Sequence, residues 1–206
     1  MEQLQRTESW LKDRYGKFTA SEIIKILGIK ALGETGKTYA IEKAIQELYG
    51  EFEEPFISYE MQNGIDTEPL AFEKFKELKG LEFLEVEKCG FFAYEKHAGA
   101  SPDGLVSDNA ILEIKCPKST TFFKLVATNE IDAKYYAQMQ MQMLCTNREK
   151  AYFFNYLVHE GKEYYHEIIV DRDEEMIQKI KDRLKEAIEI KLEYINLINK
   201  NKQWMS

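Results

Sequence analysis

The chain has 206 residues, of which 44% are hydrophobic and 31% charged, and its net charge is −8 at pH 7. This composition is that of an ordinary globular protein, large enough to bury one substantial core, so we expect a single domain over residues 1–206. The sequence has no apolar run of about 18 residues that could span a membrane, and its charged N-terminus predicts a cytoplasmic protein without a signal peptide. The acidity argues against a surface coated with phosphate-binding charge. It does not exclude a nuclease, because a few cations in one groove can hold a DNA backbone.

The cysteines and histidines do not predict a zinc site. Cys89, Cys116 and Cys145 lie far apart, the three histidines are equally scattered, and none of these residues has a zinc-binding spacing. We therefore expect three reduced cysteines that act as small packing residues.

The first quarter of the chain predicts three helices. Residues 9–15 form a short one, and "TASEIIKILG" begins a second with Thr19 or Ser21 as N-cap. A glycine-rich loop over residues 28–37 follows, after which "TYAIEKAIQELYG" has helical periodicity and stops at Gly50.

Residues 57–78 predict a long helix. We expect it to be interrupted or tightened near Asn63, Gly64 and Pro69, because proline removes a backbone donor and glycine weakens a helix. Glu68 lies beside that predicted interruption.

Strands are predicted through the middle of the chain. "LEFLEVEK" and "GFFAYEK" indicate two strands, and with the hairpin after them residues 81–115 should form most of one antiparallel unit. "YYAQMQMQMLC" alternates as a strand would, but its Gln, Met, Ala and Leu residues favour a helix. "AYFFNYLV" and "EYYHEIIV" predict two strands joined at "HEGK", and residues 173–199 predict a packing helix.

The hairpin "SPDGLVSDNAILEIKCPKS" carries the charges that indicate chemistry. If its strands pair around a turn at residues 107–109, Asp103 lies opposite Glu113. Side chains alternate along a strand, so Lys115 shares the face of both carboxylates. Two opposed carboxylates repel each other, which calls for a compensating cation.

A divalent metal would compensate these carboxylates more fully than Lys115 does. Mg²⁺ takes oxygen ligands from one or two carboxylates, with water and phosphate completing its shell. The Ile114 carbonyl can add an oxygen, and Glu68 a third carboxylate if its helix packs on the sheet. Such a site would polarise a phosphodiester while Lys115 orients or activates the attacking water. The alternative is an exposed hairpin with an ordinary Glu–Lys pair, because short patterns recur by chance.

A wider set of motifs carries a resemblance to a known family. "WLKDRYGKFTASE", "NGIDTEPLAFEKF", "SPDGLVSDNAILEIKCP" and "YYAQMQMQM" occur in the order and approximate spacing of the phage lambda exonuclease, or YqaJ-type viral recombinase, family of the PD-(D/E)xK nuclease superfamily. The likeness runs from Trp10 to about the start of the final helix, with a poor match at residues 28–56. It implies an α/β (α+β) fold with a PD-(D/E)xK restriction-endonuclease-like core, a central mixed β-sheet flanked by helices.

The resemblance also implies roles for particular residues. The catalytic set it implies is Asp103, Glu113, Lys115, Glu68 and Gln138. Asp103, Glu113 and the Ile114 backbone carbonyl would hold the metal, and Glu68 is a further candidate ligand. Gln138 would lie on a helix near the active site, which supports the helical choice for its segment.

A pocket for the 5′-phosphate of a DNA end is implied as well, with Arg14, Ser21 and Ser101 as its candidates. Arginine binds phosphate with a planar fork, and hydroxyls add donors without charge. The chain departs from the family where a second phosphate-binding arginine follows the catalytic lysine, since it has Thr120 and Thr121 there. That role is missing or passes to Lys118 or Lys124.

Taken together, the resemblance implies an exonuclease that uses one or two Mg²⁺ ions, with Mn²⁺ as a substitute. It would degrade linear double-stranded DNA from the 5′ end for phage-type recombination by single-strand annealing. It would act as a ring-shaped homotrimer with an annealing protein in the bacterial cytoplasm, encoded by a phage or prophage. The alternatives are another PD-(D/E)xK endonuclease or single-strand nuclease, a noncatalytic DNA-end-binding module, and a glycosidase using Asp103 and Glu113, which Lys115 disfavours.

Overall fold

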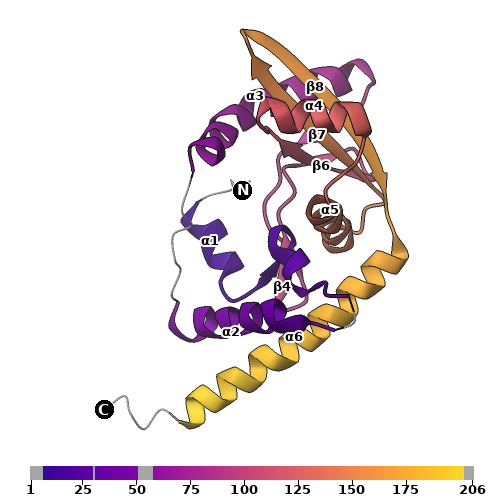
Figure 1. Ribbon diagram of the computed structural model, residues 1–206. Helices are drawn as coiled ribbons and strands as arrows, with labels where there is room; N and C mark the ends of the chain where they lie inside the picture. Colours follow the sequence, from indigo (N-terminus) through magenta and orange to yellow (C-terminus); the bar gives the residue numbers. More distant parts are fainter. Residues whose placement is uncertain (1–6, 30, 51–57, 202–206) are drawn as a thin grey trace.

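Two β-sheets form the centre of the structure, with helices around them (Figure 1). The computed structural model describes residues 7–29, 31–50 and 58–201. The larger sheet has the order β2-β5-β6-β7-β8 and the smaller one β1-β4-β3. The strands are β1 (Phe18–Thr19), β2 (Val86–Glu87), β3 (Phe92–Tyr94), β4 (Ala98–Ala100), β5 (Gly104–Val106), β6 (Ala110–Lys115), β7 (Lys150–His159) and β8 (Lys162–Asp171). The helices are α1 (Glu8–Arg14), η1 (Ala20–Ile26), α2 (Gly33–Tyr49), α3 (Tyr59–Leu81), α4 (Ser119–Thr128), α5 (Ala133–Thr146) and α6 (Glu174–Lys200).

The larger sheet is mixed. Strands β6 and β7 pair in parallel, whereas the pairs β2–β5, β5–β6 and β7–β8 are antiparallel. Strand β6 is buried from Ala110 to Ile114, as expected for a central strand covered on both faces. The predicted hairpin register is confirmed, since Gly104 pairs with Leu112 in the β5–β6 ladder. The two strands predicted on either side of "HEGK" are β7 and β8.

The prediction of one antiparallel unit over residues 81–115 is wrong. Strands β2, β5 and β6 belong to the larger sheet, whereas β3 and β4 belong to the smaller one. Strand β4 pairs in parallel with β1, about eighty residues earlier in the chain, and this long-range partner takes the β3–β4 hairpin away from the larger sheet. Local patterns do not determine such a partner.

The predicted interruption of the long helix is also wrong. Helix α3 runs continuously from Tyr59 to Leu81 with Pro69 inside it. Pro69 is exposed, so water can reach the carbonyl that proline leaves without a donor. The next turns bury Ala71, Phe72 and Phe75 against the larger sheet, and this packing outweighs the local propensity.

The segment "TASEIIKILG" forms a helix as predicted, and this helix, η1, is of the 3₁₀ type. Thr19 is its N-cap residue, but neither Thr19 nor Ser21 caps a backbone N–H with its side chain. The helix buries Ala20, Ile23 and Ile26, and η1 packs on α5. The glycine-rich loop is shorter than expected, because α2 already begins at Gly33, and α2 ends as predicted with Gly50 in the left-handed region.

The ambiguous segment is helix α5, as favoured from its composition. Met139, Gln140, Met141, Gln142 and Met143 are all buried in succession. Helix α5 contacts η1, β3, β4, β6 and α6, so it lies between the two sheets and has little face left for solvent. The alternation of Gln and Met therefore reflects burial on several sides.

Helix α6 is the predicted packing helix, and Asp173 caps its N-terminus by accepting from the N–H groups of Glu175 and Met176. It packs along α2 at the base of the view in Figure 1. In the described part of the chain, no helix is both long and apolar enough to cross a membrane.

Candidate active site

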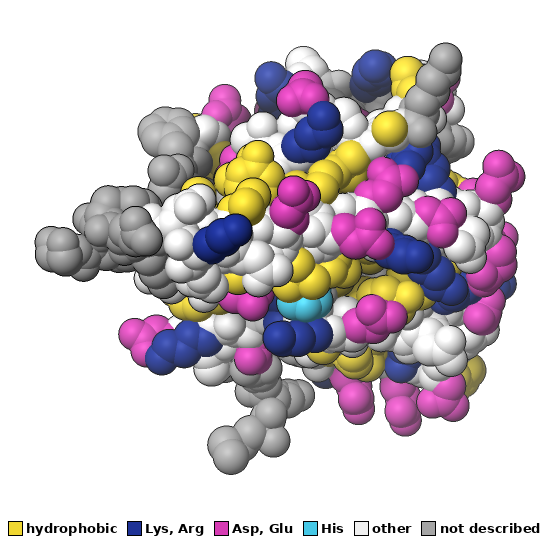
Figure 2. All heavy atoms as spheres, turned by 90° about the horizontal axis from the view of Figure 1, so that it is seen from below, with side chains coloured by type: hydrophobic (Ala, Val, Ile, Leu, Met, Phe, Trp, Pro, Cys, Tyr) yellow, Lys and Arg dark blue, Asp and Glu magenta, His cyan; other side chains and the backbone are white. Residues whose placement is uncertain are grey.

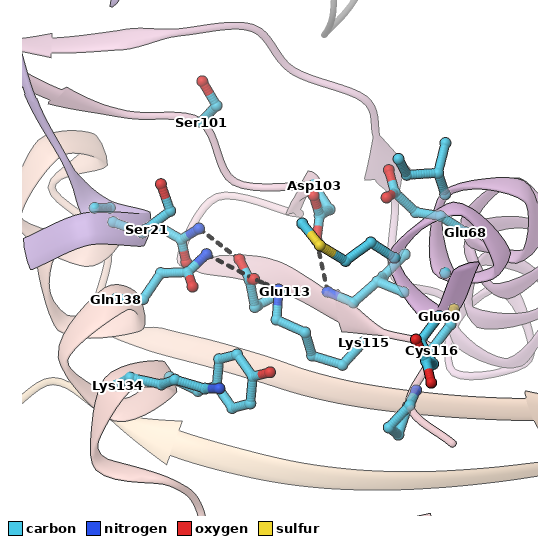
Figure 3. A pocket seen from close by; sticks show the side chains of 18 of the residues that line it. Ser21, Glu60, Glu68, Ser101, Asp103, Glu113, Lys115, Cys116, Lys134 and Gln138 are labelled. Carbon is cyan, nitrogen blue, oxygen red and sulfur yellow. Dashed lines mark hydrogen bonds and ion pairs between the residues drawn. The ribbon is translucent and has the colours of Figure 1, made fainter. Parts of the chain in front are cut away.

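A cavity of about 670 Å³ opens between α1, η1, α3, β6 and α5. The predicted site residues that line it are Arg14, Ser21, Glu68, Ser101, Asp103, Glu113, Ile114, Lys115 and Gln138. These residues come from segments spread over more than 120 positions of the sequence, and the fold brings them to one place (Figure 3). Lys118 is exposed at the N-terminus of α4 and does not line the cavity.

Asp103 lies one residue beyond the end of the β5–β6 ladder. Its N–H donates to the Leu112 carbonyl at 2.9 Å, and its Oδ2 accepts from the Ile114 N–H at 2.7 Å. The carboxylate thus takes the place of a ladder carbonyl and is fixed to the backbone of β6 next to Glu113. The position of Asp103 at the open end of this short hairpin therefore brings its carboxylate next to Glu113.

Glu113 is almost fully buried, with 1% of its surface exposed, and three donors satisfy its carboxylate. Lys115 Nζ donates to Oε1 in a close ion pair. Gln138 Nε2 donates to the same oxygen at 2.7 Å, and Gln142 Nε2 donates to Oε2 at 2.5 Å. These contacts fix both oxygens of a charge that would be costly to bury alone.

The motifs of the sequence did not point to Gln142. The signal that could have found it is its spacing, because residues four apart in a helix lie on the same face. Gln138 and Gln142 are so spaced on α5, and the structure shows both directed at Glu113.

The charges of the carboxylates and of Lys115 shift one another's pKa values. Burial raises the pKa of Asp103 well above its usual value, and the negative charges of Glu113 and Glu68 add to that effect. Burial would lower the pKa of Lys115, but the charges of Glu113 and Asp103 outweigh it, so the Lys115 pKa is raised. These shifts favour the charged form of Lys115 and the neutral form of Asp103, because two carboxylates compete for one ammonium group.

The donor set fits a hard divalent cation. Asp103 and Glu113 offer carboxylate oxygens, and the Ile114 backbone follows Glu113 on β6 and contacts Asp103. In the described ranges, no three Asp, Glu, His or Cys side chains are arranged to hold a metal. Mg²⁺ does not require three, since it commonly binds through one or two carboxylates and keeps several waters. Glu68 lines the cavity from α3, close enough for its charge to raise the Asp103 pKa.

The predicted phosphate-binding residues form a second cluster in the cavity. Arg14 donates to Ser101 Oγ at 3.4 Å and to Ser21 Oγ at 3.5 Å, and its guanidinium lies 4.2 Å from the centre of the Trp10 ring. Trp10 Nε1 also donates to Ser101 Oγ at 2.9 Å. Burial lowers the pKa of Arg14. The structure therefore groups an arginine, two hydroxyls and an indole N–H, all of which can donate to an anion.

Three solved structures with a similar fold are exonuclease structures. The crystal structure of an alkaline exonuclease (LHK-Exo) from Laribacter hongkongensis matches with a TM-score of 0.84 and 29% identity, covering 97% of this chain and all of that one. The structure of LHK-Exo in complex with dAMP matches with a TM-score of 0.81 and 30% identity over 96% of this chain and all of that one. A phage-related exonuclease from Haemophilus somnus 129PT matches in fold, with a TM-score of 0.66, 21% identity and coverage of 89% and 96%. The mixed α/β fold is thus that of the alkaline exonucleases.

The sequence itself matches the model of the YqaJ-like viral recombinase domain over residues 9–149, which is more than half of the chain. The protein belongs to this family. No curated protein matches the sequence.

Proposed function

We propose that this protein is a Mg²⁺-dependent exonuclease. It degrades linear double-stranded DNA from the 5′ end and leaves 3′ single-stranded tails for phage-type recombination by single-strand annealing. The observation that carries the proposal is the Asp103–Glu113–Lys115 group around the buried Glu113, facing a cavity whose other cluster can bind an anion. Membership of the YqaJ-like family and similarity to LHK-Exo support the same activity.

Asp103, Glu113 and the Ile114 carbonyl would hold the metal, with Glu68 as a further ligand. A bound Mg²⁺ supplies Lewis-acid polarisation of the phosphodiester and a more acidic water, and Mn²⁺ can substitute for it. Lys115 orients the attacking water and stabilises the negative charge that develops on the phosphate. Its raised pKa suits a residue that acts as a charged donor. Gln138 and Gln142 keep Glu113 in place while this happens.

At the other cluster, Arg14, Ser21 and Ser101 would bind the 5′-phosphate of the DNA end. A terminal phosphate held there places the next internucleotide phosphate toward the carboxylates, so that cleavage releases one nucleotide at a time. This arrangement gives the enzyme its preference for ends. Lys118, which the sequence also suggested, would contact DNA only outside the cavity.

The assembly proposed for the active enzyme is a homotrimeric ring around DNA, working with a single-strand annealing protein in the bacterial cytoplasm. The ring, the annealing partner and the location are proposed from the family resemblance. We also propose that residues 1–206 form one nuclease domain.

The activity is tested with linear duplexes that carry a 5′-phosphate or a 5′-hydroxyl, and with closed circles, in Mg²⁺ or EDTA. We expect linear DNA to release mononucleotides in Mg²⁺ and not in EDTA. The rate should fall by at least about 100-fold in Lys115→Ala. Cutting of circles as readily as linear DNA, or full activity of Lys115→Ala, would contradict the proposal. Binding of ends without any metal-dependent release would indicate a noncatalytic end-binding module.

A further inference from the structure

A third cation lines the cavity, away from the Arg14 cluster. Lys134 lies in the first turn of α5, and its side chain is exposed. Figure 3 shows Lys134 on the opposite side of Glu113 from Ser101. Cationic groups therefore occur on both sides of the buried Glu113, although no motif of the sequence points to Lys134.

The other two cations among the lining residues already have partners. Arg14 is directed at Ser101 and Ser21 and lies over Trp10. Lys115 is paired with Glu113. In the described part of the chain, Lys134 has no carboxylate partner within ion-pair distance, so its charge remains available to a ligand.

An aromatic ring supports this lysine. Lys134 Nζ lies 4.6 Å from the centre of the Tyr135 ring, and Lys115 Nζ lies 5.1 Å from the same ring. Tyr135 is itself packed on Phe153, with 5.6 Å between ring centres. A ring face attracts an ammonium group, so Tyr135 holds Lys134 close to the wall beside Lys115. This contact reduces the freedom of a side chain that would otherwise move widely.

From this arrangement we propose that Lys134, supported by Tyr135, binds an internucleotide phosphate of the DNA strand on the far side of the scissile phosphate from Arg14. The inference rests on the proposed exonuclease function and adds a second anchor for the strand being cut. A strand whose 5′-phosphate lies at Arg14 passes Glu113 next and then reaches Lys134. Lys134 therefore meets the phosphate that follows the scissile one, and a lysine ammonium suits a contact that must be released at each step.

The test is a binding cycle without turnover. Fluorescence anisotropy in EDTA measures the affinity for a 5′-phosphorylated duplex, intact or with a neutral methylphosphonate at the linkage after the scissile one. Wild type should lose affinity when this linkage is neutralised. Lys134→Ala should bind the intact duplex more weakly than wild type does. It should lose no further affinity when the linkage is neutralised, because the contact is already absent. The slope of log affinity against log salt should fall in magnitude by about 0.9, the value for one phosphate contact on duplex DNA.

Lys185→Ala is the matched control, since it removes the same charge from an exposed position on α6, outside the cavity. It should lose as much affinity as wild type when the linkage is neutralised. The inference would be overturned if neutralising the linkage cost Lys134→Ala as much affinity as it costs wild type. It would also be overturned if Lys118→Ala, and not Lys134→Ala, were the variant that loses no further affinity on neutralisation. A wild-type protein that binds no linear duplex would instead overturn the proposed function, and this inference with it.

Discussion

Two glutamines one helical turn apart bind both oxygens of one buried carboxylate. Gln138 donates to Oε1 of Glu113 and Gln142 to Oε2, so α5 determines the direction in which this carboxylate faces the cavity. The remaining polar atom of Gln142, its Oε1, is buried and has no hydrogen-bond partner in the described part of the chain. An unsatisfied buried acceptor costs stability, so this atom does not explain why a glutamine stands here. We infer that Gln142 acts by positioning Glu113 through its Nε2 hydrogen bond.

We therefore expect Gln142→Leu to keep the fold and to weaken metal binding. Residues that orient a metal ligand typically contribute about 10- to 100-fold to metal affinity or activity, so the Mg²⁺ concentration for half-maximal rate should rise by that factor. The measurement is DNA hydrolysis over a Mg²⁺ titration.

The control is Gln140→Leu, on the same helix. Gln140 is equally buried, but it binds the Asp171 carbonyl and the Asp173 N–H at the start of α6. This control should lower the melting temperature and leave the Mg²⁺ requirement as it is. The positioning role of Gln142 is wrong if both variants need the same Mg²⁺ concentration as wild type.

Among the secondary-structure elements, α6 supports the wall that carries the Arg14 cluster. Lys191 of α6 is fully buried, and its Nζ lies 2.5 Å from the Gly16 carbonyl, 2.5 Å from Glu47 Oε2 and 3.1 Å from His97 Nδ1. Gly16 has a φ of +64°, and a Cβ there would lie 2.9 Å from the Glu47 Cβ. The chain can therefore turn between α1 and β1 only with glycine at this position. One lysine thus connects α6 to α2 and to the turn after α1.

Replacing this lysine should destabilise the protein without touching the cavity. Lys191→Met leaves the Gly16 carbonyl without its donor, and an unsatisfied buried acceptor costs about 1–3 kcal/mol. We expect the free energy of unfolding, measured with urea, to fall by that amount. The exposed Lys185→Met on the same helix should change it by less than about 0.5 kcal/mol. Equal effects of the two substitutions would show that the Lys191 contacts do not stabilise the fold.

The elements also show which parts of the structure the sequence can predict. The β5–β6 hairpin and its register follow from a short turn and from alternation, which are local signals. The pairing of β1 with β4 joins segments about eighty residues apart, and no local pattern determines it. Asp103 and Glu113 could be found because one hairpin carries both. The spacing of Gln142 from Gln138 places both on one helix face, but that this face meets Glu113, and that Lys134 lines the cavity, depends on how α5 lies against β6.

At the scale of the whole molecule, a net charge of −8 has to be reconciled with a polyanionic substrate. Figure 2 shows the face that carries α2 and α6, where acidic side chains are spread over the surface with lysines and arginines between them. This mixed surface does not favour DNA over its whole extent. The cavity lining is also mixed, but Arg14, Lys115 and Lys134 converge there on a small region, and a bound divalent cation would offset the charge of its four carboxylates. Affinity for DNA thus depends on local grouping of cations more than on net charge.

A closed ring would extend this grouping, since it would turn the cavity side of each subunit toward one channel and leave the mixed-charge faces outside. Three chains in cyclic symmetry would place three cavities around one duplex, so a DNA end entering the channel meets an active site whichever strand it presents. We expect light scattering to give three times the chain mass of 24.2 kDa, unchanged on dilution across the concentrations used for activity. A mass of one chain at concentrations where DNA is degraded would contradict the ring. Lys134→Ala should have the same mass as wild type, which would assign its weaker DNA binding to the lost contact and not to lost assembly.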